Sequence, residues 1–475
     1  MRSDICRPHC VSAKKAAALS VFSRTALTFR VRAVIIELKH FIRRFSGSLP
    51  CTKAAHAKEK ERTTMSVFTE DRAILRGLAQ RWADIAALEA QKEHKKAWRA
   101  LYGLAPVRPV ITIDQICWNE FEKQEELVLR CTDPFARQLE GQLREVLYRW
   151  AHFPCDMVVK PYFPLGKVWS DDSFGVATVF QNEAGHDNAE THLFEDCIPD
   201  EAALEKLHTP KITYDKADNA ARKARAEEYF GDILPVKLVG SLRWVALWDR
   251  IVFWRGAETV LWDLIDRPEF LHDLMKKLVD IEMGVIDQME ALSLFESNGA
   301  FCHCQETWCD ELPKPGFDPE HVRAKDCWVS GAAQIFSEVS PAMHDEFEIQ
   351  YMKPIFERFG LVNYSCCEPL HNKIDIIRQI RNVRAISVSP WADVNIAADA
   401  MGADYVMARK PNPAYVAFAQ LDEESIIRQT RETLEACRRS GTPVIFSLKD
   451  ITTVKNDPLR LDRWHDIVKR EIERF

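Results

Sequence analysis

One short segment of the 475-residue chain concentrates side chains that could do chemistry. Within six positions it carries two thiols, a carboxyl group and an imidazole, from Cys366, Cys367, Glu368 and His371. A thiolate is both a strong nucleophile and a soft metal ligand, and carboxylate and imidazole groups are common zinc ligands. The pattern predicts a site with Cys367 and Glu368 as catalytic residues. The alternative is that the cysteines pack in the core as small apolar residues and Glu368 begins a helix.

A second segment rich in cysteine and histidine lies between Phe301 and Pro313. Its His303 and Cys304 could join the downstream thiols in a tetrahedral metal site. The candidate metal ligands are therefore Cys366, Cys367, His371 and His303, and the expected ion is Zn2+. The spacing is not that of a zinc finger, so the alternative is a loop with partly buried thiols.

Short β-rich runs alternate with helical stretches from residue 156 onward. These runs are Val158–Phe163, Lys237–Ser241, Gly299–His303, Trp328–Gln334, Leu361–Ser365, Ala385–Ser389, Tyr405–Ala408 and Val444–Ser447. Such alternation implies βαβ units and a parallel sheet. Eight runs predict an α/β fold, a (β/α)8 TIM barrel over residues 156–475, and the alternative is an open doubly wound sheet. The chain has neither a GxGxxG loop nor a GxxxxGK[ST] loop, the usual dinucleotide and P-loop signatures.

The barrel prediction collects polar and aromatic side chains at the carboxyl ends of the strands, where barrel enzymes place their chemistry. These side chains are Lys160, Tyr162, His303, Cys304, Gln334, Ser337, Cys366, Cys367, Glu368, His371, Ser389, Trp391, Lys410, Asn412, Lys449 and Asp450. Lys410 is expected to act in catalysis by binding an anionic end of the substrate or cofactor. Substrate contacts are assigned to Gln334, Ser389, Trp391 and Asn412.

The region before the barrel divides into two parts. Helical periodicity over 69–103 and 134–151 predicts a helical N-terminal cap at 65–155, interrupted by an extended piece at Val110–Ile113. Residues 1–64 carry 14 Lys and Arg against 4 Asp and Glu, whereas the remainder carries 50 against 67. A basic leader of this kind is expected to be a disordered targeting peptide or the product of a wrongly chosen start codon upstream of Met65.

The composition is that of a soluble globular protein, with 47% hydrophobic and 28% charged residues. No run of 18 apolar residues is present, so no membrane span is expected. The 14 cysteines are scattered, which favours reduced thiols in a cytoplasmic enzyme over a disulfide framework. The acidic body argues against nucleic acid as the main partner.

Several sequence segments of the chain resemble the uroporphyrinogen decarboxylase superfamily, which includes cobalamin- and coenzyme-dependent methyltransferases. The segments are DRPEFLHDLM from Asp266, SPAMHDEF from Ser340, YSCCEP from Tyr364 and ISVSPWADVNIAADAMGADYVMARKPNP from Ile386. The resemblance covers roughly residues 128–475. It implies a (β/α)8 barrel whose pocket lies at the carboxyl ends of the strands, and it allows for a homodimer.

Two departures from the family pattern bear on which activity is expected, decarboxylation or methyl transfer. Decarboxylases of porphyrinogens have an arginine-rich N-terminal loop, but Arg108 is the only arginine between residues 105 and 129. The methyltransferases carry His-x-Cys and a later cysteine; here Ser365-x-Cys367 takes that place, and Ala408–Pro411 holds no cysteine. The resemblance implies a zinc-dependent methyltransferase or demethylase of a small molecule, working with a corrinoid protein. The alternatives are a decarboxylase of a small carboxylic acid and a non-catalytic partner of a corrinoid protein.

Overall fold

The computed structural model describes residues 52–184, 190–365 and 367–475. The chain divides into two units, Met1–Val67 and Phe68–Phe475. Helix α2 (Thr52–Ala86) begins in the first unit and continues into the second. In the described residues no helix combines the length and the apolar character that a bilayer crossing needs.

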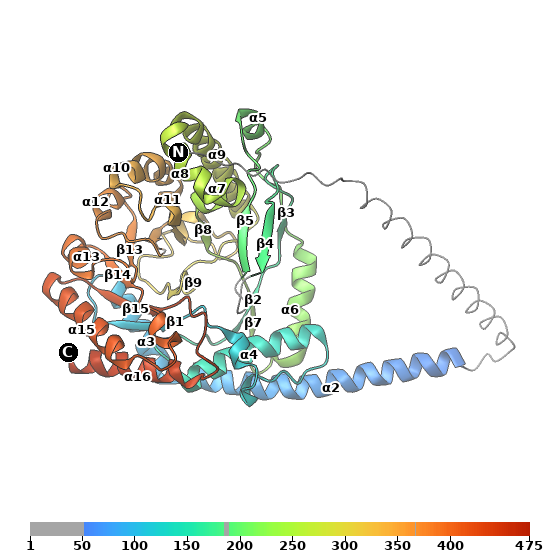
Figure 1. The fold of residues 1–475 in the computed structure, drawn as a ribbon. Helices are drawn as coiled ribbons and strands as arrows, with labels where there is room; N and C mark the ends of the chain where they lie inside the picture. The colour runs from blue at the N-terminus through green and yellow to red at the C-terminus, as the bar shows by residue number, and fades with distance from the viewer. Residues whose placement is uncertain (1–51, 185–189, 366) are drawn as a thin grey trace, which may run out of the picture. The chain divides into compact units, whose positions relative to one another are not determined.

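The centre of the second unit is a parallel sheet of seven strands (Figure 1). In order across the sheet they are β1 (Val110–Ile113), β15 (Val444–Leu448), β14 (Val406–Arg409), β13 (Val383–Val388), β12 (Leu361–Tyr364), β11 (Trp328–Gly331) and β8 (Arg243–Val245). The first strand in the chain thus lies beside the last, as in a β/α barrel. In the described part of the chain no backbone ladder joins β8 to β1. The fold is therefore α/β with a parallel sheet, and the predicted eight-stranded barrel is not confirmed.

The five later predicted strands are confirmed, whereas the three earlier ones are wrong in their pairing. Val158–Phe163 yields only the start of β2 (Phe163–Gly166), which pairs with β7 (Val236–Val239) in a separate sheet. Of the predicted strand Gly299–His303, only Phe301–Cys302 forms a strand, β9, and it pairs in a hairpin with β10 (Gln305–Glu306). The sheet instead takes up β1 and β8, because pairing of such short runs is decided by tertiary contacts rather than by propensity.

Side chains that point to one face of the sheet form successive layers from its amino to its carboxyl end, because alternate residues of a strand share a face. The first layer is apolar and buried: Val110, Trp328, Leu361, Ala385, Val406 and Ile445. The second is mostly polar and equally buried: Thr112, Ser330, Asn363, Ser387, Ala408 and Ser447. The same alternation leads to a third layer at the carboxyl ends: Ser365, Ser389, Lys410 and Lys449. The polarity of this face therefore rises toward the strand ends.

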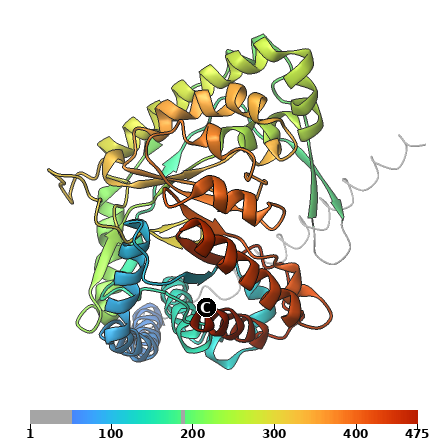
Figure 2. The same ribbon diagram turned by 90° about the vertical axis from the view of Figure 1, so that its left-hand side faces the viewer.

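Helices that follow the strands cover the other face of the sheet. In Figure 2 they succeed one another in chain order, from yellow-green α9 near the top to dark red α16 near the bottom. Besides α2, the described helices of the second unit, including those that lie elsewhere than on this face, are α3 (Glu89–Tyr102), α4 (Pro134–His152), α5 (Glu201–Leu204), α6 (Lys216–Phe230), α7 (Leu247–Arg255), α8 (Ala257–Asp266), α9 (Pro268–Ala291), α10 (Pro341–His344), α11 (Gln350–Phe356), α12 (Ile374–Ile377), α13 (Val394–Met401), α14 (Ala414–Ala417), α15 (Glu423–Ser440) and α16 (Leu459–Arg474).

Shorter elements complete the unit. Single turns of 3-10 helix are η1 (Trp118–Phe121), η2 (Glu125–Leu127), η4 (Ala324–Asp326) and η5 (Gln334–Phe336), and η6 (Asp345–Ile349) is a π-helix. Two antiparallel pairs lie outside the main sheet: β3 (Ser170–Asp171) with β6 (Ile212–Thr213), and β4 (Phe180–Ala184) with β5 (Glu190–Phe194).

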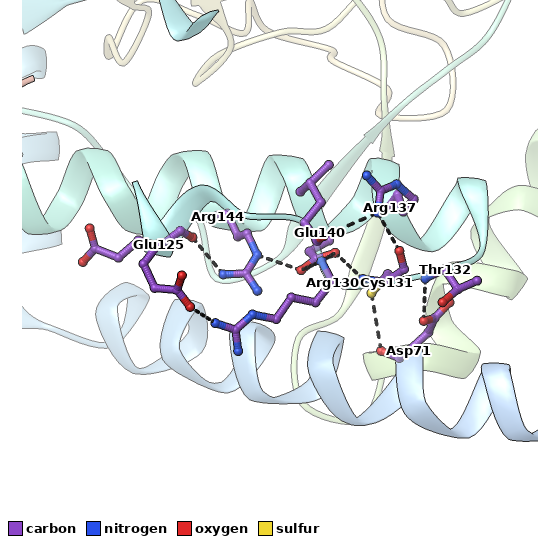
Figure 3. A network of polar contacts seen from close by, with 10 residues as sticks. Asp71, Glu125, Arg130, Cys131, Thr132, Arg137, Glu140 and Arg144 are labelled. Carbon is purple, nitrogen blue, oxygen red and sulfur yellow. Dashed lines mark hydrogen bonds and ion pairs between the residues drawn. The ribbon is translucent and has the colours of Figure 1, made fainter. Parts of the chain in front are cut away.

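A buried polar network joins α2 and α4 to the segment between η2 and α4 (Figure 3). Glu140 is fully buried and accepts hydrogen bonds from the backbone of Arg130 (2.9 Å) and Cys131 (2.8 Å) and from Arg144 Nε (2.7 Å). Burial alone would raise the pKa of Glu140, but these donors hold it below its usual value. Asp71 of α2 accepts from the backbone N–H groups of the two residues after Cys131. The segment is therefore fixed by charge-assisted hydrogen bonds rather than by apolar packing alone.

Candidate functional site

The side chain of Cys367 contacts two residues that follow a distant strand of the same sheet. The Cys367 sulfur lies 3.2 Å from Asp450 Oδ2, and Lys449 Nζ lies 3.4 Å from the same sulfur. Lys449 and Asp450 are themselves 3.0 Å apart. Cys367 follows β12 and the other two follow β15, so the carboxyl ends of two non-adjacent strands converge on one sulfur. This arrangement is the core of the candidate site.

The charge of Lys449 bears directly on the sulfur. Its side chain is buried, which disfavours the ammonium form, but Cys367 and Asp450 outweigh burial and raise the pKa of Lys449 above its usual value. A lysine held in its charged form beside a thiol stabilises the thiolate, which is the nucleophilic form. As a thiol, Cys367 can instead donate to Asp450.

Glu368, the next residue, carries a buried carboxyl group. It is fully buried, and in the described part of the chain no group donates a hydrogen bond to either oxygen. Burial raises its pKa to about 8, and the nearby charges of Glu348, Asp249 and Cys367 act in the same direction. At neutral pH Glu368 therefore holds its proton and can act as an acid.

Sequence reasoning missed a second carboxyl group, Asp249 in the first turn of α7. Burial raises the pKa of Asp249 to about 6; a backbone hydrogen bond from Gln334 opposes this shift and the charge of Glu348 adds to it. Asp249 follows Val245, the last residue of β8, by four positions, as Glu368 follows Tyr364, the last residue of β12. That spacing would have found Asp249, but β8 itself was not predicted.

Lys410 and Lys449 stand at the ends of neighbouring strands, and both are almost fully buried. Burial lowers the pKa of His303 to about 2, and the charges of both lysines add to this effect. Ser365 and Ser389 lie in the same layer, and among the described residues neither hydroxyl has a hydrogen-bond partner. Two ammonium groups with two hydroxyls suit an anionic substrate group.

The predicted metal ligands do not come together in the described residues. His303 lies in the turn between β9 and β10, and its ring stacks on Trp244 with a centroid distance of 4.5 Å. The lysine charges that disfavour imidazolium there also disfavour a metal cation. Within residues 52–184, 190–365 and 367–475 no three His, Cys, Asp or Glu side chains are grouped closely enough to hold a metal ion.

The predicted zinc ligands of the described chain, Cys367, His371 and His303, therefore do not fit a zinc site by themselves. The fourth predicted ligand, Cys366, lies outside the described residues. His371 is half-buried, and its Nδ1 has no partner among the described groups. No chemical step below is assigned to a metal, and the presence of zinc stays a prediction.

The predicted substrate residues separate into interior and surface positions. Ser389 faces the interior of the sheet layer, as Lys410 does. Gln334 is exposed at the start of η5, and Trp391 is 72% exposed. Asn412 accepts a hydrogen bond from the backbone of Ala414 and so caps its own loop. Of the four, Ser389 is the one that is fully buried, and contact with a substrate stays a prediction for all of them.

Comparisons with known proteins give little guidance. No protein-family model matches the sequence, and no curated protein matches it. A solved structure, a methyltransferase from Methanosarcina mazei, is similar over 80% of this chain and 98% of that chain, with 11% sequence identity and a TM-score of 0.44. A likeness at that level carries no argument about function, so the function must be argued from the site itself.

Proposed function

We propose that the chain is a methyltransferase or demethylase of a small molecule, and that the Cys367 thiolate is its nucleophile. The observation that carries the proposal is the contact of the Cys367 sulfur with the buried ammonium of Lys449, at 3.4 Å. A thiolate beside a fixed cation is reactive toward electrophilic carbon. Lys410, Ser365 and Ser389 would bind an anionic end of the methyl donor.

The step is a displacement at the methyl carbon. The sulfur of Cys367 supplies the electron pair of a new S–C bond while the bond from that carbon to the heteroatom of the donor breaks. The heteroatom keeps its electron pair, and where it leaves as a basic oxygen or nitrogen it takes a proton from Glu368, which is protonated at neutral pH; a thioether released from a sulfonium leaves without one. In the second step an electron pair of the acceptor would form a new bond to the methyl carbon while the S–C bond breaks and its electron pair returns to Cys367 as the thiolate; the sequence resemblance implies a corrinoid protein as that acceptor. That partner, a closed barrel and zinc all stay predictions.

A label experiment tests the nucleophile. The full chain is incubated with trideuteromethyl-labelled sulfonium, quaternary ammonium and methoxyarene donors that each also carry a carboxylate, and its cysteine peptides are weighed by mass spectrometry. Label is expected on the Cys367 peptide of the wild type and on no peptide of the Cys367→Ser variant. The Cys197→Ser variant, altered at a cysteine far from β12 in the chain, is the matched control and should label as the wild type does. Turnover of a donor that survives Cys367→Ser would overturn the proposal.

Decarboxylation of a small carboxylic acid is the second candidate, and the buried lysines favour it. Lys410 and Lys449 could hold a carboxylate, and the protonated Glu368 could deliver a proton to the carbanion left after CO2 departs. This reaction does not need the thiol. Release of CO2 that survives Cys367→Ser but not Lys410→Met would identify a decarboxylase. Zinc content, measured on the same two proteins, would establish a metal site only if zinc is present and is lost with Cys367.

A further inference from the structure

A cavity of about 220 Å³ lies between the N-terminal helices and β1, and Cys367 is not among the residues that line it. Its walls come from α2, α4, β1, the segment before β2, and the β9–β10 hairpin. None of Cys367, Glu368, Lys410 and Lys449 lines it. A ligand in this cavity would therefore be separate from the reacting groups of the proposed function.

Most of the cavity wall is apolar, including Trp82, Ile113 and Val146. An apolar cavity of about 150 Å³ is large enough to take up benzene. A volume of 220 Å³ can therefore hold one aromatic ring, or a chain of similar size, together with a small polar group. The indole nitrogen of Trp82 is already bonded to the backbone oxygen of Lys160 at 2.8 Å, so this ring presents its apolar surface.

The polar part of the wall holds two cations and one carboxyl group. Glu306 is 8% exposed, and its Oε1 accepts from the backbone of Val158 at 3.3 Å. The charges of Lys160 and Arg149 both act on Glu306. Arg149 also donates to the backbone oxygen of Ile113 at 2.7 Å, which fixes its guanidinium at the cavity. Burial raises the pKa of Glu306 to about 7, so with Lys160 and Arg149 charged the cavity carries one excess positive charge when Glu306 is ionised and two when it is protonated; an anionic ligand group would balance one of them.

We propose that this cavity is a second ligand site for a small monocarboxylate with an apolar body of about one ring. The apolar part would lie against Trp82 and Val146, and the carboxylate would pair with Lys160 and Arg149. An amine of the same shape would meet two cations, and a neutral alcohol would leave the excess charge unbalanced. The site therefore discriminates by charge as well as by size.

Binding of matched probes tests the site on the full chain. Calorimetry and thermal unfolding are measured with benzoate, phenylacetate, benzylamine and benzyl alcohol. The two carboxylates are expected to bind at least about tenfold more tightly than the amine or the alcohol, and to raise the unfolding temperature. Binding of benzylamine as tight as that of phenylacetate, or no binding by either carboxylate, would overturn the proposal.

Two variants locate the binding. Val146→Trp fills the cavity and should abolish carboxylate binding, whereas Lys160→Met keeps the side-chain length and should weaken it at least about tenfold by removing the charge. Lys92→Met, at an exposed position outside the cavity, is the matched control and should bind as the wild type does. Should Val146→Trp fail to fold, Lys160→Met still decides the question. Unchanged affinity in Lys160→Met would place the probes elsewhere and overturn the proposal.

Discussion

Cys367 and Lys449 are 82 residues apart in the chain, yet the lysine nitrogen lies 3.4 Å from the cysteine sulfur. Neither residue belongs to a local motif with the other. They meet because β12 and β15 run parallel in one sheet and both residues follow the carboxyl end of their strand. The contact places a positive charge beside the thiol of Cys367, and a positive charge stabilises the thiolate form.

The first prediction concerns the reactivity of this thiol. Lys449→Met removes the charge that stabilises the thiolate, so a smaller fraction of Cys367 is ionised at neutral pH. An opposite charge at this distance changes the thiolate fraction about tenfold or more, and we expect alkylation of Cys367 by iodoacetamide at pH 7 to slow by that factor. Peptide mass spectrometry over a time course measures the rate for each cysteine separately.

Cys197 is the internal reference for this measurement, since its sulfur contacts the backbone oxygen of Glu195 rather than a lysine. Its alkylation rate should be the same in the wild type and in Lys449→Met. Equal rates at Cys367 in both proteins would show that Lys449 does not activate the sulfur.

The second prediction concerns the network in Figure 3. Glu140→Ala leaves Arg144 buried without its carboxylate and leaves two backbone N–H groups without an acceptor. Breaking a buried pair of this kind costs about 3 kcal/mol or more in the free energy of unfolding. Glu125→Ala breaks the ion pair with Arg130, whose partners are 80% and 54% exposed, and should cost under about 1 kcal/mol. Urea unfolding curves of the two variants measure the difference, and equal losses would contradict it.

The sequence predicted the later strands well because each is a buried run between helices, from Trp328 to Leu448. It failed at β8, since Arg243 and Trp244 do not form an apolar run and the strand is only three residues long. It also placed Val110–Ile113 in the helical cap, although this piece pairs with β15. Strand pairing between distant segments depends on tertiary packing, which periodicity does not encode.

For the site, sequence position at a strand end was an effective guide, because it collected Lys449, Asp450 and Cys367 into one set. It could not show that these three side chains touch while His303 turns toward Trp244. Both His303, with a φ of 42° in the hairpin turn, and Asp450, with a φ of 57°, adopt left-handed backbone conformations that the sequence did not predict. Left-handed positions re-aim side chains in a way that residue types alone do not reveal.

The third prediction concerns Asp249. Because burial raises its pKa from 3.8 to about 6, the native carboxyl group keeps its proton to higher pH than the unfolded one does. Deprotonation then costs native stability as the pH rises through this window, and the full cost is present above about pH 6. Asp249→Asn cannot ionise, so it should be more stable than the wild type at pH 7 by about 3 kcal/mol. The advantage should fade as the pH falls toward 4.

Chemical unfolding at a series of pH values tests this sign directly. Asp280→Asn, which changes an exposed aspartate of α9, serves as the comparison. An Asp249→Asn protein that is less stable than the wild type at pH 7 would show that the carboxylate is compensated in the native state. A stabilised protein with reduced turnover would show that Asp249 is retained for the reaction at a cost in stability.

The fourth prediction concerns Glu368 as the acid. Glu368→Gln keeps the size of the side chain but has no proton to transfer, so turnover should fall by about 100-fold to 10,000-fold. Methylation of Cys367 should slow most for donors whose leaving group is a strong base, because those depend most on protonation. Donors with a weakly basic leaving group, such as a sulfonium, should be affected least. Glu338→Gln, at an exposed position after η5, is the matched control and should leave turnover unchanged. A uniform loss across donors would instead mean that Glu368 positions the substrate, since only proton transfer makes the loss depend on the leaving group.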